Sequence, residues 1–372
     1  MKVTVERAEL LKSLGHVHRV VERRNTIPIL ANVLLRAGNA KLSLKATDLD
    51  LEVIEPIAAE VGAGGATTVP AHMFYEIVRK LPEGSQVTIE ALGDRASLAI
   101  RAGRSRFSLQ TLPESDFPDL AAGDMTHRFT IAAGDAKKLI EKTQFAISTE
   151  ETRYYLNGIY LHYVEGGKTP TLRAVATDGH RLAQFELPAP DGASGMPGII
   201  VPRKTVGELQ RLIDDSAAEL TIELSTNKIR FTMGEMILTS KLIDGTFPDY
   251  GRVIPLGNDK MLVVDKADFE AAVDRVSTVS SERGRAVKLS LAAGKLTLSV
   301  TNPDSGSATE EIEVDYDGDP LDIGFNSRYL LDIASQIGGE NAVLKLADPG
   351  SPTLIQDRDA EGALYVLMPM RV

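Results

Sequence analysis

The chain has 372 residues, 43% of them hydrophobic and 25% charged, carries a formal net charge of −11 and contains no cysteine. Without cysteine there are no disulfide bonds, thiolate zinc sites or cysteine nucleophiles, and an acidic net charge taken alone argues against a nucleic-acid partner. No apolar run approaches the ~20 residues of a membrane span, and the first residues lack the apolar stretch of a secretory signal, so we expect a soluble cytoplasmic protein.

In chain order, the sequence predicts a strand followed by an amphipathic helix six times. The predicted helices cover residues 6–20, 71–81, 135–148, 203–215, 266–280 and 327–336. One strand-plus-helix unit opens at Val3, Phe129 and Met261, and a second opens at Thr67, Ile199 and Asp322. A pattern that returns with each third of the chain predicts three similar domains.

Between the helices, short segments alternate apolar and polar residues and are separated by Gly, Asp and Pro. Each third carries about two helices and eight or more such strands, linked too closely for parallel crossovers. The prediction is an α+β fold with antiparallel sheets. Polar and Gly-containing stretches near Asp124–His127 and Gly257–Lys260 place the domains at 1–126, 127–258 and 259–372.

The candidate catalytic residues are Asp178, His180 and Arg181 in the segment ATDGHRL. An Asp and a His two positions apart at a strand end could act as an acid–base pair or bind a metal. The alternative is a turn, because Asp can bond its own backbone and Gly accepts a positive φ. The pair His16 and His18 is predicted to point to different faces of a helix. No nucleophile, metal or phosphate-loop motif occurs, so the sequence predicts no catalytic residue, metal or cofactor.

Two surface features suggest binding instead. The tail VLMPMRV, from Val366 to Val372, is rich in methionine, which adapts to several partners; a final edge strand in the protein's own core is the alternative. The predicted helices carry slightly more Lys and Arg than Asp and Glu, so the acidic excess lies on strands and loops. This distribution indicates a less acidic helix-bearing face, although helices also attract Lys and Arg in general.

Several segments, taken in order with the repeat, resemble one family over essentially the whole chain: TIPILANVLL, TTVPA, GRSRFSLQTLP, RYYLNGIY, VATDGHRLA, VPRK, TSKLIDGTFPDY and YVLMPMRV. This family is the bacterial β sliding clamp, the β subunit of DNA polymerase III. The resemblance implies the DNA clamp fold, with three similar domains each of two helices packed on antiparallel sheets, in a head-to-tail dimeric ring. It also implies a cytoplasmic, nucleoid-associated and non-catalytic processivity factor of DNA replication, which encircles duplex DNA without sequence preference.

In this family, the first domain of one subunit meets the third domain of the other. The residues that correspond are Arg104, Arg106 and Phe107 on one side and Thr278, Val279, Glu310, Glu311 and Glu313 on the other. The charges of the two sides are opposite. Thr278 is polar where relatives often carry a larger aliphatic residue, so the apolar part of this interface should be smaller.

The family's peptide pocket lies between the second and third domains. It takes short linear motifs from the DNA polymerase III α subunit, the clamp loader, other polymerases and repair proteins. The corresponding residues are Leu156, Thr177, Gly179, His180, Arg181, Leu182, Pro248, Arg252, Val253, Val366, Met368, Pro369 and Met370. This assignment unites ATDGHRL and the Met-rich tail in one site, with His180 as a wall residue. Gly251 stands where relatives often carry a basic residue.

DNA contact in such a clamp should be electrostatic and weak, because the ring has to slide. The candidates are Lys12, Arg24, Arg79, Lys80, Lys138, Lys142, Arg203 and Lys204, and the alternative for each is a solvated helix surface. Two rival functions stay open on the sequence: an enzyme that uses Asp178 and His180, and a repeat-built interaction protein that never contacts nucleic acid.

Overall fold

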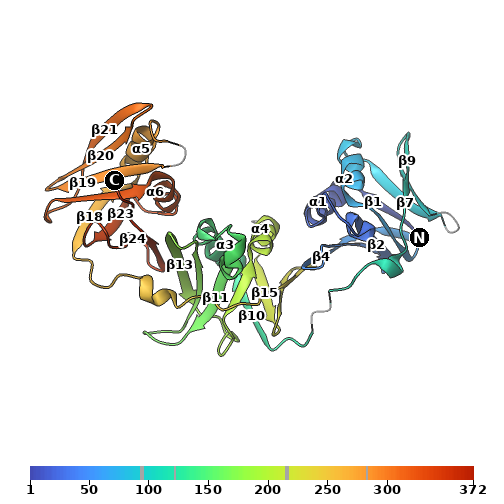
Figure 1. Ribbon diagram of the computed structural model, residues 1–372. Coiled ribbons are helices and arrows are strands. Elements are labelled where there is room, and N and C mark those ends of the chain that lie inside the picture. The colour runs from blue at the N-terminus through green and yellow to red at the C-terminus, as the bar shows by residue number, and fades with distance from the viewer. Residues whose placement is uncertain (93–95, 121–122, 214–217, 282–283) are drawn as a thin grey trace. The chain divides into compact units, whose positions relative to one another are not determined.

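The computed structural model describes residues 1–92, 96–120, 123–213, 218–281 and 284–372 (Figure 1). Within these ranges lie six α-helices: α1 (Arg7–Val17), α2 (Ala71–Lys80), α3 (Ala133–Glu141), α4 (Arg203–Leu212), α5 (Lys266–Ser277) and α6 (Ser327–Ala334). The six predicted helices are therefore confirmed in number and position. None of these helices has the length and apolar character needed to cross a bilayer.

Each helix ends before its predicted end, and the largest difference is at α3, which stops at Glu141 instead of residue 148. Thr143 leaves the helical conformation with a φ of −127°, and its hydroxyl donates to the Leu139 carbonyl (2.6 Å). A separate 3-10 turn, η3 (Gln144–Ala146), follows. The apolar residues therefore continue at helical spacing in the sequence although the α-helix has ended. The last two residues predicted for α4, 214 and 215, lie outside the described residues.

Local capping explains where several helices begin. The Asp265 carboxylate accepts from the Asp268 backbone N–H (2.9 Å) at the start of α5, and the Asn326 side chain accepts from the Arg328 N–H (3.0 Å) at the start of α6. Side-chain acceptors of this kind satisfy N–H groups that have no partner inside the helix. The buried residues of α5 then follow helical spacing: Phe269, Ala272, Val273 and Val276.

The strands form three similar series. The first third holds β1 (Lys2–Glu6), β2 (Asn32–Gly38), β3 (Lys41–Thr47), β4 (Leu51–Ala58), β5 (Glu60–Ala63), β6 (Gly65–Pro70), β7 (Gln86–Leu92), β8 (Ser97–Ala102) and β9 (Ser105–Gln110). The middle third holds β10 (His127–Ala132), β11 (Gly158–Val164), β12 (Thr171–Thr177), β13 (Arg181–Pro188), β14 (Ile199–Pro202), β15 (Glu219–Leu224), β16 (Lys228–Met233) and β17 (Met236–Lys241). The last third holds β18 (Lys260–Asp265), β19 (Ala286–Ala292), β20 (Lys295–Asn302), β21 (Gly306–Glu313), β22 (Leu321–Asn326), β23 (Asn341–Leu346), β24 (Thr353–Asp357) and β25 (Ala363–Leu367).

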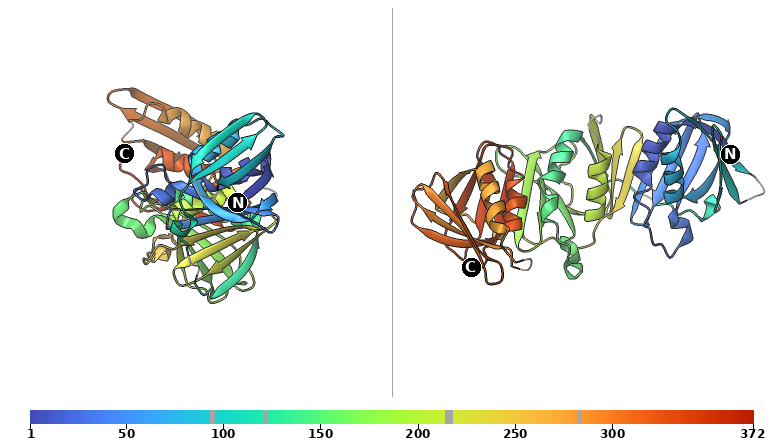
Figure 2. Two further views of the ribbon diagram at one scale, coloured as in Figure 1. Left: turned by 90° about the vertical axis from the view of Figure 1, so that its right-hand side faces the viewer. Right: turned by 90° about the horizontal axis from the view of Figure 1, so that it is seen from above.

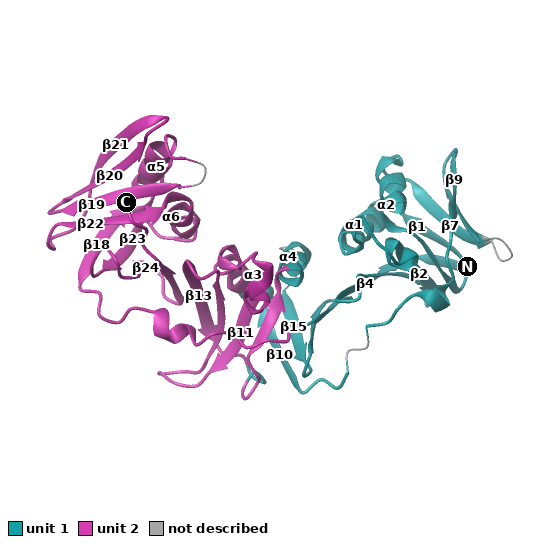
Figure 3. Ribbon diagram, viewed as in Figure 1, with its two compact units in different colours: residues 1–136, 191–193, 204–242 teal, residues 137–190, 194–203, 243–372 magenta. Residues whose placement is uncertain are grey.

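The chain divides into two compact units (Figure 3): unit 1 contains residues 1–136, 191–193 and 204–242, and unit 2 contains residues 137–190, 194–203 and 243–372. Unit 1 has an eight-stranded sheet, β10-β15-β16-β17-β4-β3-β2-β6, and a five-stranded sheet, β5-β1-β7-β8-β9. Unit 2 has an eight-stranded sheet, β14-β11-β12-β13-β25-β24-β23-β18, and a four-stranded sheet, β21-β20-β19-β22. In unit 1, α1 contacts α2, β3 and β4; in unit 2, α5 contacts α6, β20 and β21. The right-hand view of Figure 2 shows the orange and red helices of unit 2, α5 and α6, side by side. The strand pairs of both units are antiparallel, as predicted.

Each eight-stranded sheet continues from one third of the chain into the next. In unit 1, β17 pairs with β4, so that Leu238 lies opposite Val53. In unit 2, β25 pairs with β13, so that Val366 lies opposite Leu182. These two pairings are equivalent in the repeat, because β4 matches β13 and β17 matches β25. The matching strands that remain, β9 in the first third and β21 in the last, lie at the edges of the smaller sheets.

Candidate functional site

The segment ATDGHRL forms a tight turn between β12 and β13. The Asp178 Oδ1 accepts from the backbone N–H groups of His180 (2.9 Å) and Arg181 (3.1 Å), and the Thr177 hydroxyl donates to the Arg181 carbonyl (2.7 Å). Gly179 has a φ of +89°, a conformation that glycine adopts without steric cost. The carboxylate of Asp178 therefore serves the backbone, and the interpretation of this segment as a turn is confirmed.

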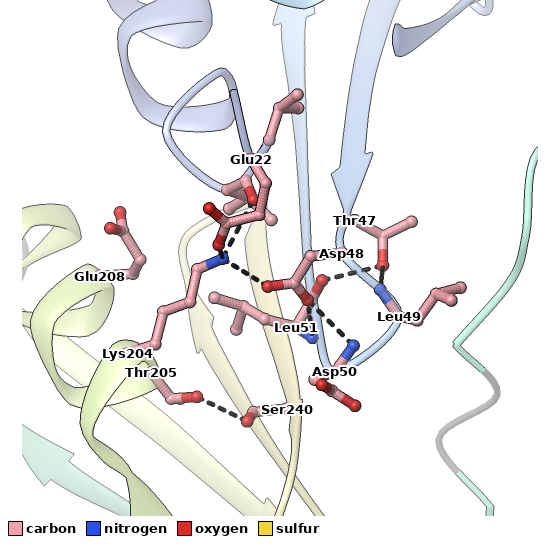
Figure 4. Close-up of polar contacts among 12 residues, drawn as sticks. Glu22, Thr47, Asp48, Leu49, Asp50, Leu51, Lys204, Thr205, Glu208 and Ser240 are labelled. Atoms are coloured by element: carbon pink, nitrogen blue, oxygen red, sulfur yellow. Dashed lines mark hydrogen bonds and ion pairs between the residues drawn. The ribbon is translucent and has the colours of Figure 1, made fainter. Parts of the chain in front are cut away.

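The same turn recurs in the other two thirds. Asp48 Oδ1 accepts from the N–H groups of Asp50 (2.9 Å) and Leu51 (2.7 Å) (Figure 4), and the Asn302 side chain accepts from the Asp304 N–H (3.0 Å). Leu49 occupies the glycine place of the first copy with a φ of +79°, which is strained for a residue with a Cβ. Because this turn is present in every copy of the repeat, it is part of the scaffold, and the presence of Asp178 alone does not indicate a catalytic site.

Arg181 links this turn to neighbouring elements of unit 2, and its side chain is 10% exposed. Its guanidinium pairs with Asp178 (3.2 Å) and with Asp332 of α6 (2.5 Å), and it donates to the Phe145 carbonyl (2.7 Å). The same group lies 4.2 Å from the centroid of the Tyr329 ring, within the range of a cation–π contact. Arg181 therefore holds η3, the turn and α6 together.

An apolar cluster lies beside the turn and consists of Leu156, Val175, Leu182, Ile200, Phe247 and Val366. Leu182 follows Arg181 in β13, so it points to the opposite face of the sheet. The backbone N–H of Met368 donates to the His180 carbonyl (2.9 Å). The structure therefore brings residues 177–182 next to residues 366–368, as the predicted pocket requires.

Three further predicted pocket residues, Pro248, Arg252 and Val253, are close in sequence to Phe247 of this cluster and to Tyr250 and Ile254, which pack against it. Pro248 follows the buried Phe247, and Val253 is 46% exposed. Arg252 forms an exposed ion pair with Asp249 (2.8 Å). These residues lie in the segment that connects β17 with β18, which includes the 3-10 turn η5 (Tyr250–Val253).

The sequence left two interpretations of the tail open, a Met-rich binding surface and a final strand in the protein's own core, and the structure supports part of each. Val366 and Leu367 are buried in β25, so the strand does pack into the core. Met368 is 39% exposed, and the backbone N–H of Met370 donates to the Gly324 carbonyl (2.7 Å). The tail is thus fixed against β22 and β13 while its methionine side chains are partly accessible.

A cavity of about 570 Å³ opens on the side of the turn that faces α6. Its lining residues are Phe145, Ile147, Ser148, Thr149, Glu150, Asp178, His180, Arg181, Arg285, Asn326, Arg328 and Tyr329. The His180 ring lies against the Tyr329 ring, with centroids 6.4 Å apart. Asn326 and Tyr329 were missed by sequence reasoning. One signal was present, because Asn326 is polar where the two matching positions hold Pro70 and Pro202.

The eight predicted DNA contacts fall into two groups. Six side chains are exposed: Lys12, Arg24, Arg79, Lys80, Lys138 and Arg203. Of these, Arg79 also pairs with Glu76 (2.7 Å). The other two side chains are half-buried, and each contacts a partner within its own unit. Lys142 donates to the Gln336 carbonyl in unit 2, and burial lowers the pKa of its ammonium group.

Lys204, at the start of α4, is held by the first third of the chain (Figure 4). Its ammonium group pairs with the carboxylates of Glu22 and Asp48, and the neighbouring Thr205 shares a hydrogen bond with Ser240 (2.7 Å). Burial lowers the pKa of Lys204, but the hydrogen bonds from the two carboxylates outweigh this effect and raise it overall. Lys204 therefore stays charged and ties α4 to the Asp48 turn.

The predicted interface residues lie at or near two sheet edges. Phe107, on β9, is 38% exposed, and Arg104 and Arg106 are exposed beside it. Glu310, Glu311 and Glu313 lie on β21, and Thr278 and Val279 directly follow α5.

Part of the acidic charge on β21 is paired inside the chain. Arg275 donates to Glu310 (2.5 and 2.9 Å), which lowers the pKa of that carboxyl. Lys295 pairs with Glu311 (2.7 Å). The charge that this edge offers to a partner is therefore smaller than the sequence indicates.

Comparison with known proteins agrees with this architecture. Three family profiles match in succession: the N-terminal, central and C-terminal domains of the DNA polymerase III beta subunit, over residues 1–121, 130–249 and 251–371. The beta sliding clamp of Caulobacter vibrioides is 55% identical over 372 residues, and that of Escherichia coli K12 is 42% identical over 375 residues, each with 100% of both chains covered. The crystal structure of the DnaN sliding clamp from Bartonella birtlesii bound to griselimycin has a TM-score of 0.97 at 55% identity, covering 100% of both chains. The chain belongs to the DNA polymerase III beta subunit family.

Proposed function

We propose that the chain is a DNA sliding clamp, which closes as a head-to-tail homodimer around duplex DNA and tethers the replicative polymerase. The observation that carries this proposal is that two of the three equivalent strand pairings are made within the chain, while the strands of the third lie at sheet edges. The chain makes the same joint twice, between β4 and β17 and between β13 and β25. The third set of matching strands, β21 and β9, lies at sheet edges. Pairing β9 of one copy with β21 of a second copy would make that joint between chains.

Such an interface joins two different surfaces, so it closes into a ring when its rotation closes. It also covers strand edges that would otherwise be templates for aggregation. Arg104 and Arg106 on one edge are opposite in charge to the exposed Glu313 on the other, where Glu311 already pairs with Lys295, and Phe107 supplies an exposed apolar contact.

A closed ring would stay on the DNA because it encircles the duplex, so it needs no tight binding to the phosphates. Six exposed cations on a protein with a net charge of −11 suit weak phosphate contacts, which allow sliding. The turn at Asp178 is structural, and among the described residues no group of three or more His, Cys, Asp or Glu side chains could hold a metal ion. The clamp acts as a non-catalytic processivity factor in the cytoplasm, at the nucleoid.

Partner proteins would bind at the apolar cluster and its rim. A linear motif would place apolar side chains beside Leu182 and Val366, under Pro248, Val253 and Met368, which is the usual design of a preformed peptide groove. Relatives from Bartonella birtlesii and Pseudomonas aeruginosa are bound to griselimycin, which therefore serves as the probe for this site. The natural partners are the DNA polymerase III α subunit, the clamp loader, other polymerases and repair proteins.

The decisive experiment loads the protein with a clamp loader and ATP onto nicked circular DNA and then linearises the DNA. A clamp held by enclosure stays on the circle and leaves from the free ends after linearisation. Retention on linear DNA, or failure to be retained on the circle, would contradict the proposal. Light scattering provides the matching control, with a mass near twice 40.1 kDa for the ring.

A further inference from the structure

Tyr250, the first residue of η5, is held by polar side chains that project from the eight-stranded sheet of unit 2. Its hydroxyl accepts from Arg173 Nη1 (3.0 Å) and lies 2.9 Å from His162 Nε2. Arg173 also pairs with Glu186 (2.7 Å). The phenol oxygen accepts from arginine and keeps its own hydrogen, so in the neutral tautomer of His162 that leaves Nε2 without hydrogen, the Tyr250 hydroxyl donates to Nε2.

This network fixes the segment that carries the proposed rim of the pocket. The Tyr250 N–H donates to the Pro248 carbonyl (2.7 Å), and the buried Phe247 stacks on Tyr160 with centroids 4.8 Å apart and planes 8° apart. Pro248 and Val253 themselves are exposed. The position of the rim therefore depends on Phe247 and Tyr250 beneath it.

The first third of the chain offers an internal comparison. There, Arg36 and Ser43 form the cross-strand pair that corresponds to His162 and Arg173 in the middle third. The matching segment SDFPDL ends in Leu120, where GTFPDY ends in Tyr250. The network therefore belongs to the sheet that carries the proposed pocket and is not a general part of the repeat.

We propose that His162, Arg173 and Glu186 are positioning residues for the peptide pocket, which hold the rim through Tyr250 and release it when His162 is protonated. This inference rests on the proposed function, because it concerns the same pocket. In protonated His162 both ring nitrogens carry hydrogen, so the Tyr250 hydroxyl would lose its acceptor and face two cations.

The charged and titratable groups around His162 come from several elements: Tyr160 on its own strand, Arg173 on β12, Glu186 on β13 and Tyr250 on the covering segment. Burial and the charge of Arg173 lower the pKa of His162 from its ordinary value of 6.5, against the opposing effects of a hydrogen bond with the Tyr163 backbone and of the charge of Glu186. Peptide affinity should accordingly be constant near neutral pH and fall below pH 6.5.

The test measures the affinity of the full chain for griselimycin by calorimetry at pH 7.5, 6.5 and 5.5. In the wild type we expect weaker binding at pH 5.5 than at pH 7.5, with a loss of at most the roughly three- to tenfold that one hydrogen bond contributes. His162→Gln, whose amide does not titrate, should lose this dependence. Tyr250→Phe should bind about three- to tenfold more weakly at pH 7.5, with a flat profile. Tyr163→Phe, a neighbouring tyrosine on the same strand, is the matched control and should behave like the wild type.

A pH profile of His162→Gln as steep as that of the wild type would overturn the inference, as would a flat wild-type profile. If Tyr250→Phe fails to fold, as judged by circular dichroism, the profile of His162→Gln still decides. Absence of griselimycin binding by the wild type at every pH would instead refute the proposed pocket. The two failures are therefore distinguishable.

Discussion

Replacing Lys204 with methionine removes a charge that the structure places between two carboxylates while it keeps most of the side-chain volume. Glu22 is 57% exposed, and an exposed pair of this kind contributes about 0.2–1 kcal/mol. Asp48 is 12% exposed, and a charge-assisted hydrogen bond contributes about 1.5–3 kcal/mol. Since Lys204 is itself 36% exposed, solvent screening reduces the second value to about 1 kcal/mol.

Lys204→Met should therefore lower the free energy of unfolding by about 1.5 kcal/mol. For a unit of about 150–250 residues, this corresponds to a fall of about 3–6 °C in the Tm of the first transition. Differential scanning calorimetry at low and high salt measures this fall in Tm. The difference in Tm between the wild type and Lys204→Met should be smaller in about 1 M NaCl, where exposed ion pairs are screened.

Two controls make this prediction sharp. Asp48→Asn keeps an oxygen that can accept from the Asp50 and Leu51 N–H groups, so the double variant with Lys204→Met should show a coupling of about 1 kcal/mol. Arg203→Met alters the exposed neighbour on the same helix and should change the stability by less than about 0.5 kcal/mol. An unchanged Tm in Lys204→Met, together with weaker DNA retention, would mean that Lys204 faces DNA and that the ion pairs do not stabilise the fold.

Three further predictions concern the interface, the tail and the first domain. Phe107→Asp should convert the dimer into a monomer of 40.1 kDa by light scattering, because it places a charge in the apolar contact; an intact dimer would exclude β9 from the interface. Deleting Met368–Val372 should abolish griselimycin binding and leave the dimer intact, and a dimer lost with the tail would count against the assignment. His18 stacks on Tyr75 (3.9 Å, 7°), and burial lowers the pKa of His18 below 6.5, so the unfolded chain takes up the proton first as the pH falls. Wild-type stability should decrease from pH 7.5 to 5.5, and a decrease of equal size in His18→Gln would show that another group is responsible.

Repetition made much of the fold predictable from the sequence. The same alternation of strand and helix occurs in each third, so six helices and the antiparallel class could be predicted without knowledge of any contact. The end of α3 could not, because the apolar spacing continues through Phe145 while Thr143 interrupts the helix. Strand alternation also shows that β4 and β17 are strands but does not identify them as partners.

The site was less accessible to sequence reasoning. The resemblance, rather than periodicity, united residues 177–182 with the tail. Charge and helix position predicted Lys142 and Lys204 as DNA contacts in the same way as the six exposed cations. The sequence does not reveal that Lys142 contacts the Gln336 carbonyl or that Lys204 pairs with Asp48. Asn326 and Tyr329 line the cavity beside His180 but carry no charge or motif, and the one signal was the polar Asn326 at a repeat position that elsewhere holds Pro70 and Pro202.

The sheets that run across the repeat boundaries have a consequence for dissecting the protein. Expression of residues 1–126 alone would separate β4 from β17 and leave a bare strand edge, which promotes aggregation. The two compact units keep these strands together, but each is assembled from separated stretches of chain. A single cleavage therefore cannot release either one, and fragments cut at the apparent repeat limits should be insoluble unless they are produced together.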